Sequence, residues 1–137
     1  MSVEWDELVP STVFTRIKTS FSDGLKTKYK MTDKSFSTAG SSDTPAVFPF
    51  VRVQLLPGTE EGEDLEGDTI NAEKFSFQID VTDNQSQTRA KEVMREVKRI
   101  MKSMRFSGAS MPTQDDTKDT YRQTARFSRQ IGSGDVY

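Results

Sequence analysis

Charged side chains are the groups through which this chain would act chemically, because its 137 residues include no His and no Cys. The absence of His removes the commonest general base and the commonest metal ligand. The absence of Cys removes thiol nucleophiles, zinc–thiolate sites and disulfides, which suits a reducing compartment or an extracellular particle assembled in one. An enzyme would need carboxylates or lysines instead. We therefore expect a protein that is not an enzyme and that holds no metal or cofactor.

One acidic segment stands out among the carboxylates. Residues 60–68 contain six acids and no base, namely Glu60, Glu61, Glu63, Asp64, Glu66 and Asp68. Carboxylates at alternating positions suit Ca²⁺, but the segment lacks the twelve-residue pattern with Gly at position six and Glu at position twelve. We interpret it as a solvated hairpin tip. Two alternatives stay open: cation binding, and the lining of a passage for an anionic molecule such as DNA, which like charge would keep from adhering.

A second group of acids lies later in the chain, at Asp115, Asp116 and Asp119. These carboxylates could in principle form a catalytic pair. A polar loop explains them equally well, so they do not by themselves indicate an active site.

Basic residues concentrate between the two acidic groups. Residues 89–105 carry seven bases against two acids, so the formal net charge of −2 conceals a strong asymmetry along the chain. The segment could follow a nucleic-acid backbone, but no glycine-rich phosphate loop, zinc finger or aromatic RNA-binding signature accompanies it. A solvated helix face, or a contact with a neighbouring subunit's acidic loop, is the favoured interpretation.

Further bases, Arg122, Arg126 and Arg129, lie near the end of the chain. They could hold an anion, but charge on an edge strand that discourages aggregation explains them equally well. The candidate residues for a contact with another subunit or a partner are Arg95, Lys98, Arg99, Lys102, Arg122 and Arg126.

Hydrophobic spacing predicts the elements that position these charges. A first helix is predicted over 6–21, with Pro10 in its first turn and Gly24 as its left-handed stop. Its apolar face consists of Val13, Phe14, Ile17 and Phe21. A second helix is expected to begin at Asp83 or Ser86 and to end before Gly108. Its apolar stripe consists of Ala90, Val93, Met94, Val97, Ile100, Met101 and Met104.

Alternation with a period of two predicts three strands, over 47–58, 72–81 and 118–131. The first two are expected to form an antiparallel hairpin across the acidic connection. The predicted apolar faces consist of Val51, Val53 and Leu55, then Phe75, Phe77, Ile79 and Val81, and finally Tyr121, Ala125, Phe127 and Ile131.

The order helix, strand, strand, helix, strand predicts an α+β fold, in which two helices pack on one face of a small antiparallel or mixed β-sheet. We expect a single domain over 1–137, with flexible segments near 26–46, 59–70, 107–117 and 132–137. No run approaches eighteen apolar residues, which excludes a membrane span, and the first residues lack the pattern of a secretory signal.

The same order resembles the tail terminator, or tail completion, proteins of long-tailed bacteriophages, the family that includes the lambda-type minor tail protein U. Four stretches carry the resemblance: "STVFTRIKTSF", "FPFVRVQLLPG", "FSFQIDVTDNQSQTRAKEVMREVKRIMKSMRF" and "YRQTARFSRQI". They span most of the chain, but they are patterns rather than catalytic signatures. The long segments at 26–46 and 59–70 are less typical of a minimal member.

The resemblance implies a structural protein of the virion, assembled in the host cytoplasm. Such proteins form a hexameric ring that caps the tail tube, stops its polymerisation and offers a surface for head–tail joining. The implied partners are copies of the same chain, the tail tube protein and the head–tail connector, while DNA passes through the lumen without specific binding. The alternatives are a head-closure or neck connector protein of the same virion, or, less favoured, a nucleic-acid-binding regulator that uses the basic helix 86–105.

Overall fold

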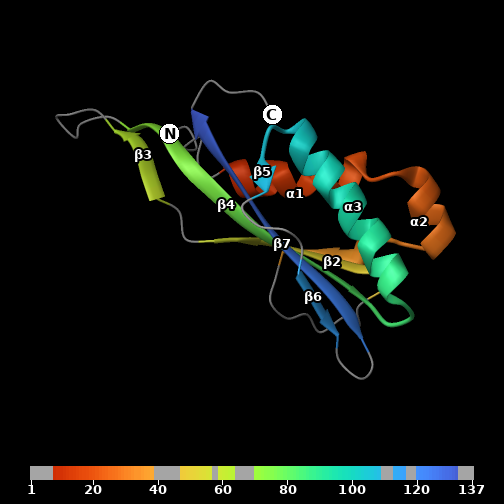
Figure 1. The fold of residues 1–137 in the computed structure, drawn as a ribbon. Helices are drawn as coiled ribbons and strands as arrows, with labels where there is room; N and C mark the ends of the chain where they lie inside the picture. Colours follow the sequence, from red (N-terminus) through yellow and green to blue (C-terminus); the bar gives the residue numbers. More distant parts are fainter. Residues whose placement is uncertain are drawn as a thin grey trace.

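The computed structural model describes residues 8–38, 47–56, 59–63, 70–108, 113–116 and 120–132, and of residues 59–63, 70–73 and 113–116 it describes the backbone alone. The elements follow one another as α1 (Val9–Ser20), α2 (Asp23–Tyr29), the 3₁₀ turn η2 (Asp33–Ser35), β1 (Phe36–Ser37), β2 (Phe50–Leu55), β3 (Thr59–Glu63), β4 (Ile70–Asp83), α3 (Gln87–Ser103), β5 (Ser107–Gly108), β6 (Thr113–Asp116) and β7 (Tyr121–Gly132) (Figure 1).

A mixed sheet with the strand order β1-β2-β4-β7-β5 forms one layer of the fold. β1 and β2 are parallel, whereas the other pairings among the described strands are antiparallel. The long strands β4 and β7 pair from Ala72 opposite Gly132 to Asp83 opposite Tyr121. β2 and β3 lie along the other edge of β4, and β5 and β6 lie along the other edge of β7. Short strands therefore flank a central long pair.

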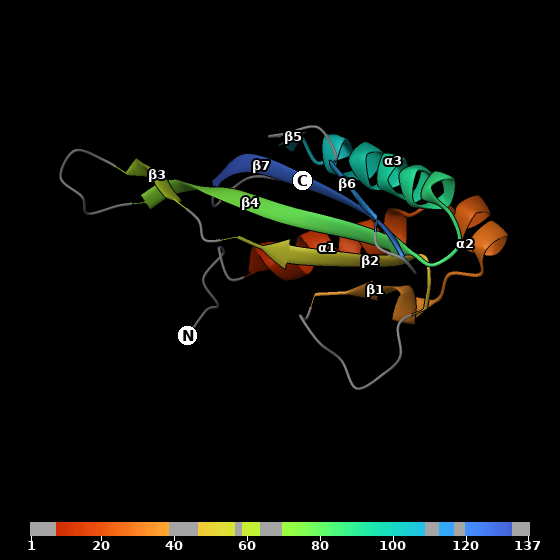
Figure 2. The ribbon, with the colours of Figure 1, turned by 60° about the horizontal axis from the view of Figure 1, so that its bottom comes forward.

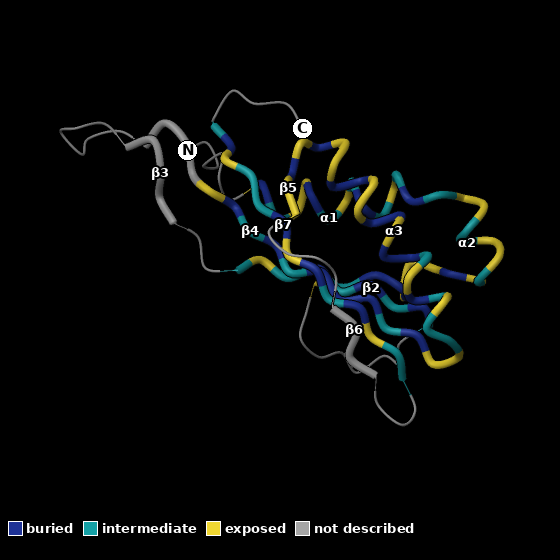
Figure 3. The backbone as a smooth tube through the Cα atoms, in the orientation of Figure 1, coloured by how far each residue is buried: buried dark blue, intermediate teal, exposed yellow. Residues whose placement is uncertain are grey.

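The helices cover one face of this sheet because alternate residues of the strands are apolar. In β4, Phe75, Phe77, Ile79 and Val81 are all buried. α3 contacts both β4 and β7, and α1 contacts α3 (Figure 2). Figure 3 shows burial along the backbone: buried positions lie on the central strands and on the side of α3 that faces them, and exposed positions lie on the outer side of α3. The predicted α+β architecture with helices on one face is therefore confirmed.

The apolar stripe predicted on the second helix is confirmed as the centre of the core. All seven of its residues, Ala90, Val93, Met94, Val97, Ile100, Met101 and Met104, have at most 1% of their surface exposed. Burying one such side chain stabilises the fold by about 1.5–3 kcal/mol. α1 adds Val9, Val13 and Ile17, which recur every four residues and are fully buried. No helix within the described ranges is both long enough and apolar enough to cross a membrane.

Local sequence explains where α3 begins and ends. Ser86 is its N-cap, and the Ser86 hydroxyl accepts a hydrogen bond from the Arg89 backbone N–H at 3.2 Å. Asp83, the other predicted cap, instead accepts from the backbone N–H of Ser86 in the preceding turn. The helix ends at Ser103, before Gly108 as predicted, and Arg105 just beyond it is in a left-handed conformation, φ 66°. Gly108 itself lies in β5.

Two predictions about the N-terminal half are wrong. Gly24 does not stop the first helix, because α1 ends at Ser20 and Gly24 lies inside α2. The reason is Ser22, whose hydroxyl accepts a hydrogen bond from the Leu25 N–H and so begins a second helix. The predicted flexible segment near 26–46 is therefore wrong for the end of α2, for η2 and for β1.

The predicted loops near 59–70 and 107–117 contain strands. β3 forms within the acidic segment, and β5 and β6 form on either side of residues 109–112. The hairpin of the first two predicted strands is confirmed as the antiparallel pair β2–β4, but β3 intervenes between them in the chain. Leu55, predicted on the apolar face with Val51 and Val53, is 43% exposed. The tail segment 133–137 lies outside the described residues, while Gly132 ends β7.

Candidate functional site

The basic helix α3 presents two different sides outside its buried stripe. Because successive residues are about 100° apart around a helix, Glu92, Glu96 and Arg99 fall on one side, and Lys91, Arg95, Lys98 and Lys102 fall on the other. The first side faces the junction of α1 and α2. The second side carries a cationic stripe with the spacing i, i+4, i+7 and i+11, and all four of its residues are exposed.

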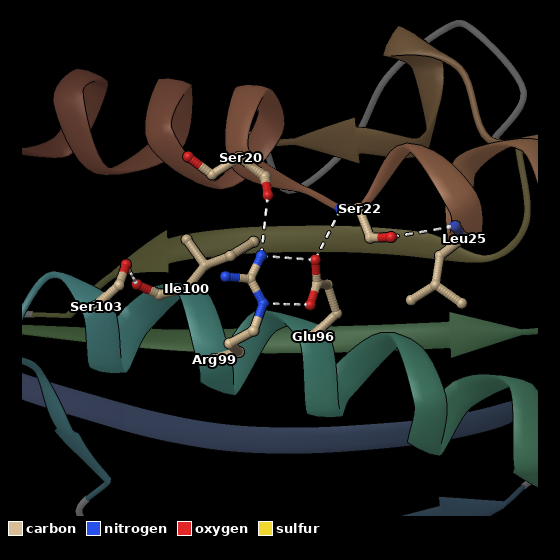
Figure 4. Close-up of polar contacts among 7 residues, drawn as sticks. All are labelled: Ser20, Ser22, Leu25, Glu96, Arg99, Ile100 and Ser103. Carbon is tan, nitrogen blue, oxygen red and sulfur yellow. Dashed lines mark hydrogen bonds and ion pairs between the residues drawn. The ribbon is translucent and has the colours of Figure 1, made fainter.

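Glu96 fastens α3 to the α1–α2 junction (Figure 4). Its Oε2 accepts a hydrogen bond from the Ser22 backbone N–H at 2.7 Å. Arg99 donates from Nε to Oε1 at 2.6 Å and from Nη2 to Oε2 at 2.8 Å, and the same Nη2 donates to the Ser20 carbonyl at 3.1 Å. A bidentate arginine–carboxylate pair is one of the stronger polar contacts in proteins. We call this group, consisting of Ser20, Ser22, Glu96 and Arg99, the Glu96 clasp.

The clasp determines the charge state of Glu96, which is only 8% exposed. The hydrogen bond from Arg99 is the main reason that the pKa of the Glu96 carboxyl lies below its ordinary value of 4.5; burial opposes this shift, and the Ser22 N–H supports it. Glu96 is therefore charged at neutral pH, and its charge is satisfied within the subunit.

A second polar cluster fastens the start of α3 to α2. The Tyr29 hydroxyl donates to Glu92 Oε2, and Lys28 Nζ lies 3.5 Å from the same oxygen. Burial and the contact with Glu92 raise the pKa of Tyr29 above 10.0, while the hydrogen bond from Tyr29 lowers the pKa of Glu92. Arg89 stacks on the Tyr29 ring, 4.8 Å from its centroid, and pairs with the fully buried Asp83 at 3.4 Å.

The cationic stripe has a different environment. A groove of about 480 Å³ runs beside it, lined by Arg95, Lys98, Arg99, Lys102, Phe106, Ser107, Gly108 and Phe127. Phe106, which lies between α3 and β5, and Phe127 of β7 are almost fully buried beneath it. Within the described part of the chain, Lys98 and Lys102 form no ion pair. This groove, with cations on one wall, is the strongest candidate binding surface among the described residues.

The six predicted contact residues do not form one site. Arg95, Lys98 and Lys102 lie on the groove, while the Arg99 guanidinium also borders it but is bound to Glu96. Arg122 and Arg126 alternate with the buried residues of β7 and so project from the sheet face opposite the helices.

That opposite face is polar and internally hydrogen-bonded. Arg126 donates from Nε to the Gln78 side-chain oxygen at 3.2 Å, and Thr124 donates to Asp80 Oδ1 at 2.7 Å. Arg122 and Arg126 therefore cannot bind the same small group as the bases of α3, because the sheet separates the two sets.

The acidic segment is described in part. Glu60, Glu61 and Glu63 lie in β3, where their backbones pair with Glu73, Ala72 and Ile70 of β4. Asp64, Glu66 and Asp68 lie outside the described residues, as does Asp119, whereas Asp115 and Asp116 lie in β6. The described side chains contain no cluster of acids suited to a metal ion. Cation binding by the acidic segment therefore stays a prediction.

Sequence reasoning missed both polar clusters on the inner side of α3. The signal for the Glu96 clasp was the i, i+3 spacing of Glu96 and Arg99. The signal for its partner was Ser22 followed by Asp23, a typical helix start. The backbone N–H of Ser22, the N-cap residue, is the one that donates to Glu96. The link between them joins residues 74 positions apart, so no local pattern could reveal it.

No protein-family model matches the chain, and a search of curated proteins also finds no match.

Proposed function

We propose that this chain is a structural tail terminator, or tail completion, protein of a long-tailed bacteriophage. It would assemble as a ring that caps the tail tube, stops tube polymerisation and provides the surface for head–tail joining. The proposal is supported by the order and spacing of the elements, which resemble that family, and by the α+β protomer with helices on one sheet face.

The observation that carries the proposal is the division of charge on α3. The acids Glu92 and Glu96 form contacts inside the subunit, whereas Arg95, Lys98 and Lys102 of the cationic stripe are exposed beside a groove. A ring of identical subunits needs two different complementary patches on each copy. An outward cationic surface and a separate acidic strand, β3, are suited to that requirement.

Two experiments test the proposal. Native mass spectrometry and negative-stain imaging of the purified protein should show a closed ring, for which we expect six subunits. In an assembly assay, the protein should complete tails that lack a terminator. If it instead joins to heads that lack a neck protein, it is a head-closure or neck connector. A protein that restores neither particle is not a tail terminator.

The cationic groove also favours a second candidate, a nucleic-acid-binding regulator. Binding through phosphate contacts weakens steeply with salt because it releases counterions. A gel-shift titration at about 50 and 200 mM salt therefore separates the two candidates. Tight binding that falls by a factor of about 10² over this range, as expected for phosphate contacts from the four bases of the cationic stripe, would favour the regulator.

A further inference from the structure

A second, smaller hollow lies at the edge of the sheet, beyond the end of α3. Its volume is about 300 Å³, and it is lined by Lys74, Arg105, Ser107, Ser128, Arg129 and Gln130. Three of these residues are basic, the other three carry a hydroxyl or an amide that can donate a hydrogen bond, and none is acidic. Bases gathered in a hollow without acids concentrate positive potential there. We call this hollow the Arg105 cleft.

Strand pairing brings the polar residues of the cleft together. Lys74 of β4 lies opposite Gln130 of β7, and Ser128 of β7 lies opposite Ser107 of β5. Lys74, Ser128 and Gln130 each adjoin a buried apolar residue of their strand, so alternation places them on the sheet face opposite the helices. Three paired strands therefore hold this side of the cleft in a fixed register.

The three bases of the cleft have different surroundings. Arg129 Nη1 donates at 3.1 Å to the carbonyl of Met104, the residue just before Arg105, and this bond fixes one positive charge beside the Arg105 backbone. Lys74 and Arg105 are exposed, and within the described part of the chain they form no ion pair. Their charges are therefore available to an anion that enters the cleft.

The backbone at Arg105 is a second observation that points to a ligand. After α3, the Phe106 N–H donates to the Met101 carbonyl at 3.0 Å. The Arg105 N–H donates to the Lys102 carbonyl at 2.9 Å. This kind of C-terminal turn has a left-handed residue, usually glycine, at the position that Arg105 occupies with φ 66°. A side chain there costs stability, and such strained positions cluster at ligand-binding sites.

We propose that the Arg105 cleft binds a phosphate group, with Arg105 and Lys74 as its main cationic ligands and the hydroxyls of Ser107 and Ser128 as further donors. A phosphate group carries about two negative charges and three strong acceptor oxygens, so it can use donors that approach from several sides. Hydrogen bonds between oppositely charged groups are the stronger ones in proteins. The phosphate belongs either to a small phosphorylated compound or to the backbone of a nucleic acid. The inference does not depend on the assembly of the chain into a tail.

Titration of the whole chain with inorganic phosphate tests the site. ¹⁵N-labelled protein is titrated at constant ionic strength, with phosphate replacing chloride, and the backbone amides are followed by NMR. We expect saturable binding, with the largest shifts at the amides of Lys74, Arg105, Ser107, Ser128 and Gln130. A titration that does not saturate, or shifts confined to the bases of the α3 groove, would overturn the proposal.

Arg105→Gly separates binding from stability. The variant removes the strain, so it should be at least as stable as the wild type in urea denaturation. Phosphate binding should nonetheless weaken by a factor of about 10 or more, because a hydrogen bond between charged groups is lost.

The matched control for this variant is Lys30→Gly. It also replaces a left-handed basic residue, φ 56°, and removes one positive charge, but it lies beside the start of α3. The length of the helix places it about 25 Å from Arg105. Its charge is screened over that distance, so phosphate should bind within a factor of about two of the wild type. Equal weakening by both variants would mean that net charge alone governs binding, and would overturn the site.

Lys74→Gln tests the opposite wall and leaves the backbone at Arg105 unchanged. It should also weaken phosphate binding, by a factor of about 3–10, because the lysine is exposed and its charge is partly screened. If Arg105→Gly does not fold, wild-type binding by Lys74→Gln overturns the proposal by itself.

Two further ligands identify the source of the phosphate. One is a single-stranded oligonucleotide of about eight residues, which presents backbone phosphates, and the other is a mononucleotide with a 5′-phosphate. Oligonucleotide binding that shifts the same amides and weakens in Arg105→Gly assigns the cleft to a nucleic-acid backbone. Binding of only inorganic phosphate and the mononucleotide assigns it to a small phosphorylated compound. If none of the three ligands shifts these amides, the cleft does not bind phosphate.

Discussion

Replacement of Glu96 is the sharpest test of how α3 is held in the fold. Glu96→Gln keeps the size of the side chain and an oxygen that can accept from Ser22, but it loses the charge that binds Arg99. Hydrogen bonds to charged groups contribute about 1.5–3 kcal/mol. Arg99 is 58% exposed, so solvent screening reduces its share. We therefore expect Glu96→Gln to lower the free energy of unfolding by about 1–2 kcal/mol.

Glu96→Ala should cost more, about 2–3 kcal/mol, because the Ser22 N–H then loses its acceptor in a part-buried site. The difference between the two variants separates the hydrogen bond to Ser22 from the charge. Urea denaturation at pH 7, followed by far-UV circular dichroism, measures both. Asp33→Asn serves as the control, since the Asp33 side chain is 88% exposed, and it should change stability by less than about 0.5 kcal/mol.

The pH dependence gives this prediction a second readout. The pKa of Glu96 is lower in the folded chain than its ordinary value of 4.5, so the clasp stabilises the protein above that value. The contribution is lost as the pH falls through the folded pKa, because the carboxyl is then protonated in both states. The difference between the wild type and Glu96→Gln should therefore shrink below about pH 4.5. A difference that stays constant from pH 7 to pH 3.5 would refute the assignment of the stabilisation to the Glu96 charge.

Five further substitutions test three other features: the Tyr29–Glu92 contact, the packing of Ile100 and the backbone at Arg105. Tyr29→Phe should destabilise the protein by about 1 kcal/mol, because the hydrogen bond to Glu92 is lost. The pKa of Tyr29 is raised in the folded chain, so wild-type stability should fall as the pH rises above 10. Glu92→Gln should lower the pKa of Tyr29, measured by tyrosinate absorbance at alkaline pH. A Glu92→Gln variant with an unchanged titration would contradict that contact. Ile100→Ala should cost about 2–5 kcal/mol and Ile100→Val about 0.5–1.5 kcal/mol in urea denaturation; similar values for the two would contradict close packing. Arg105→Gly should raise stability by about 0.5–1 kcal/mol, because φ 66° is unfavourable for a residue with a side chain; a loss of stability would mean that the Arg105 side chain makes a compensating contact.

The strong periodic signals predicted the architecture because each depends on a single run of sequence. The stripe from Ala90 to Met104 repeats at the period of a helix, and the run from Phe75 to Val81 alternates as a half-buried strand does. Both faces are buried where the pattern placed them. The α+β class followed, since two such faces can cover each other.

The errors arose where polar sequence forms structure through distant pairing. β3 has the composition of a loop, with three glutamates in five residues, yet its backbone pairs with β4. β6 is equally polar and pairs with β7. Strand propensity depends strongly on the neighbouring strand that is offered. Here the long strands β4 and β7 extend beyond their apolar segments and provide that neighbour.

The candidate site was predicted only in part for a related reason. Seven bases in one segment suggested a single cationic surface, but a helix divides its residues among sides that meet different neighbours. Ser22 and Tyr29, far away in sequence, decide that one side of α3 is internal. Without these contacts, the sequence does not distinguish Arg99, which binds within the subunit, from Lys98, which is exposed.

Because Arg99 and Lys98 lie on different sides of α3, reversing the charge of one should affect stability and reversing the other should not. Arg99→Glu places a second carboxylate against Glu96, which is bound to the Ser22 N–H, so the variant should be clearly less stable than the wild type in urea denaturation. Lys98→Glu changes a side chain that has no ion-pair partner within the described residues, so stability should change by less than about 0.5 kcal/mol. If the groove is the contact between subunits, association should nonetheless weaken in the Lys98 variant. Loss of association without loss of stability would separate a binding surface from a structural contact, whereas equal destabilisation by both reversals would refute the two-sided description of the helix.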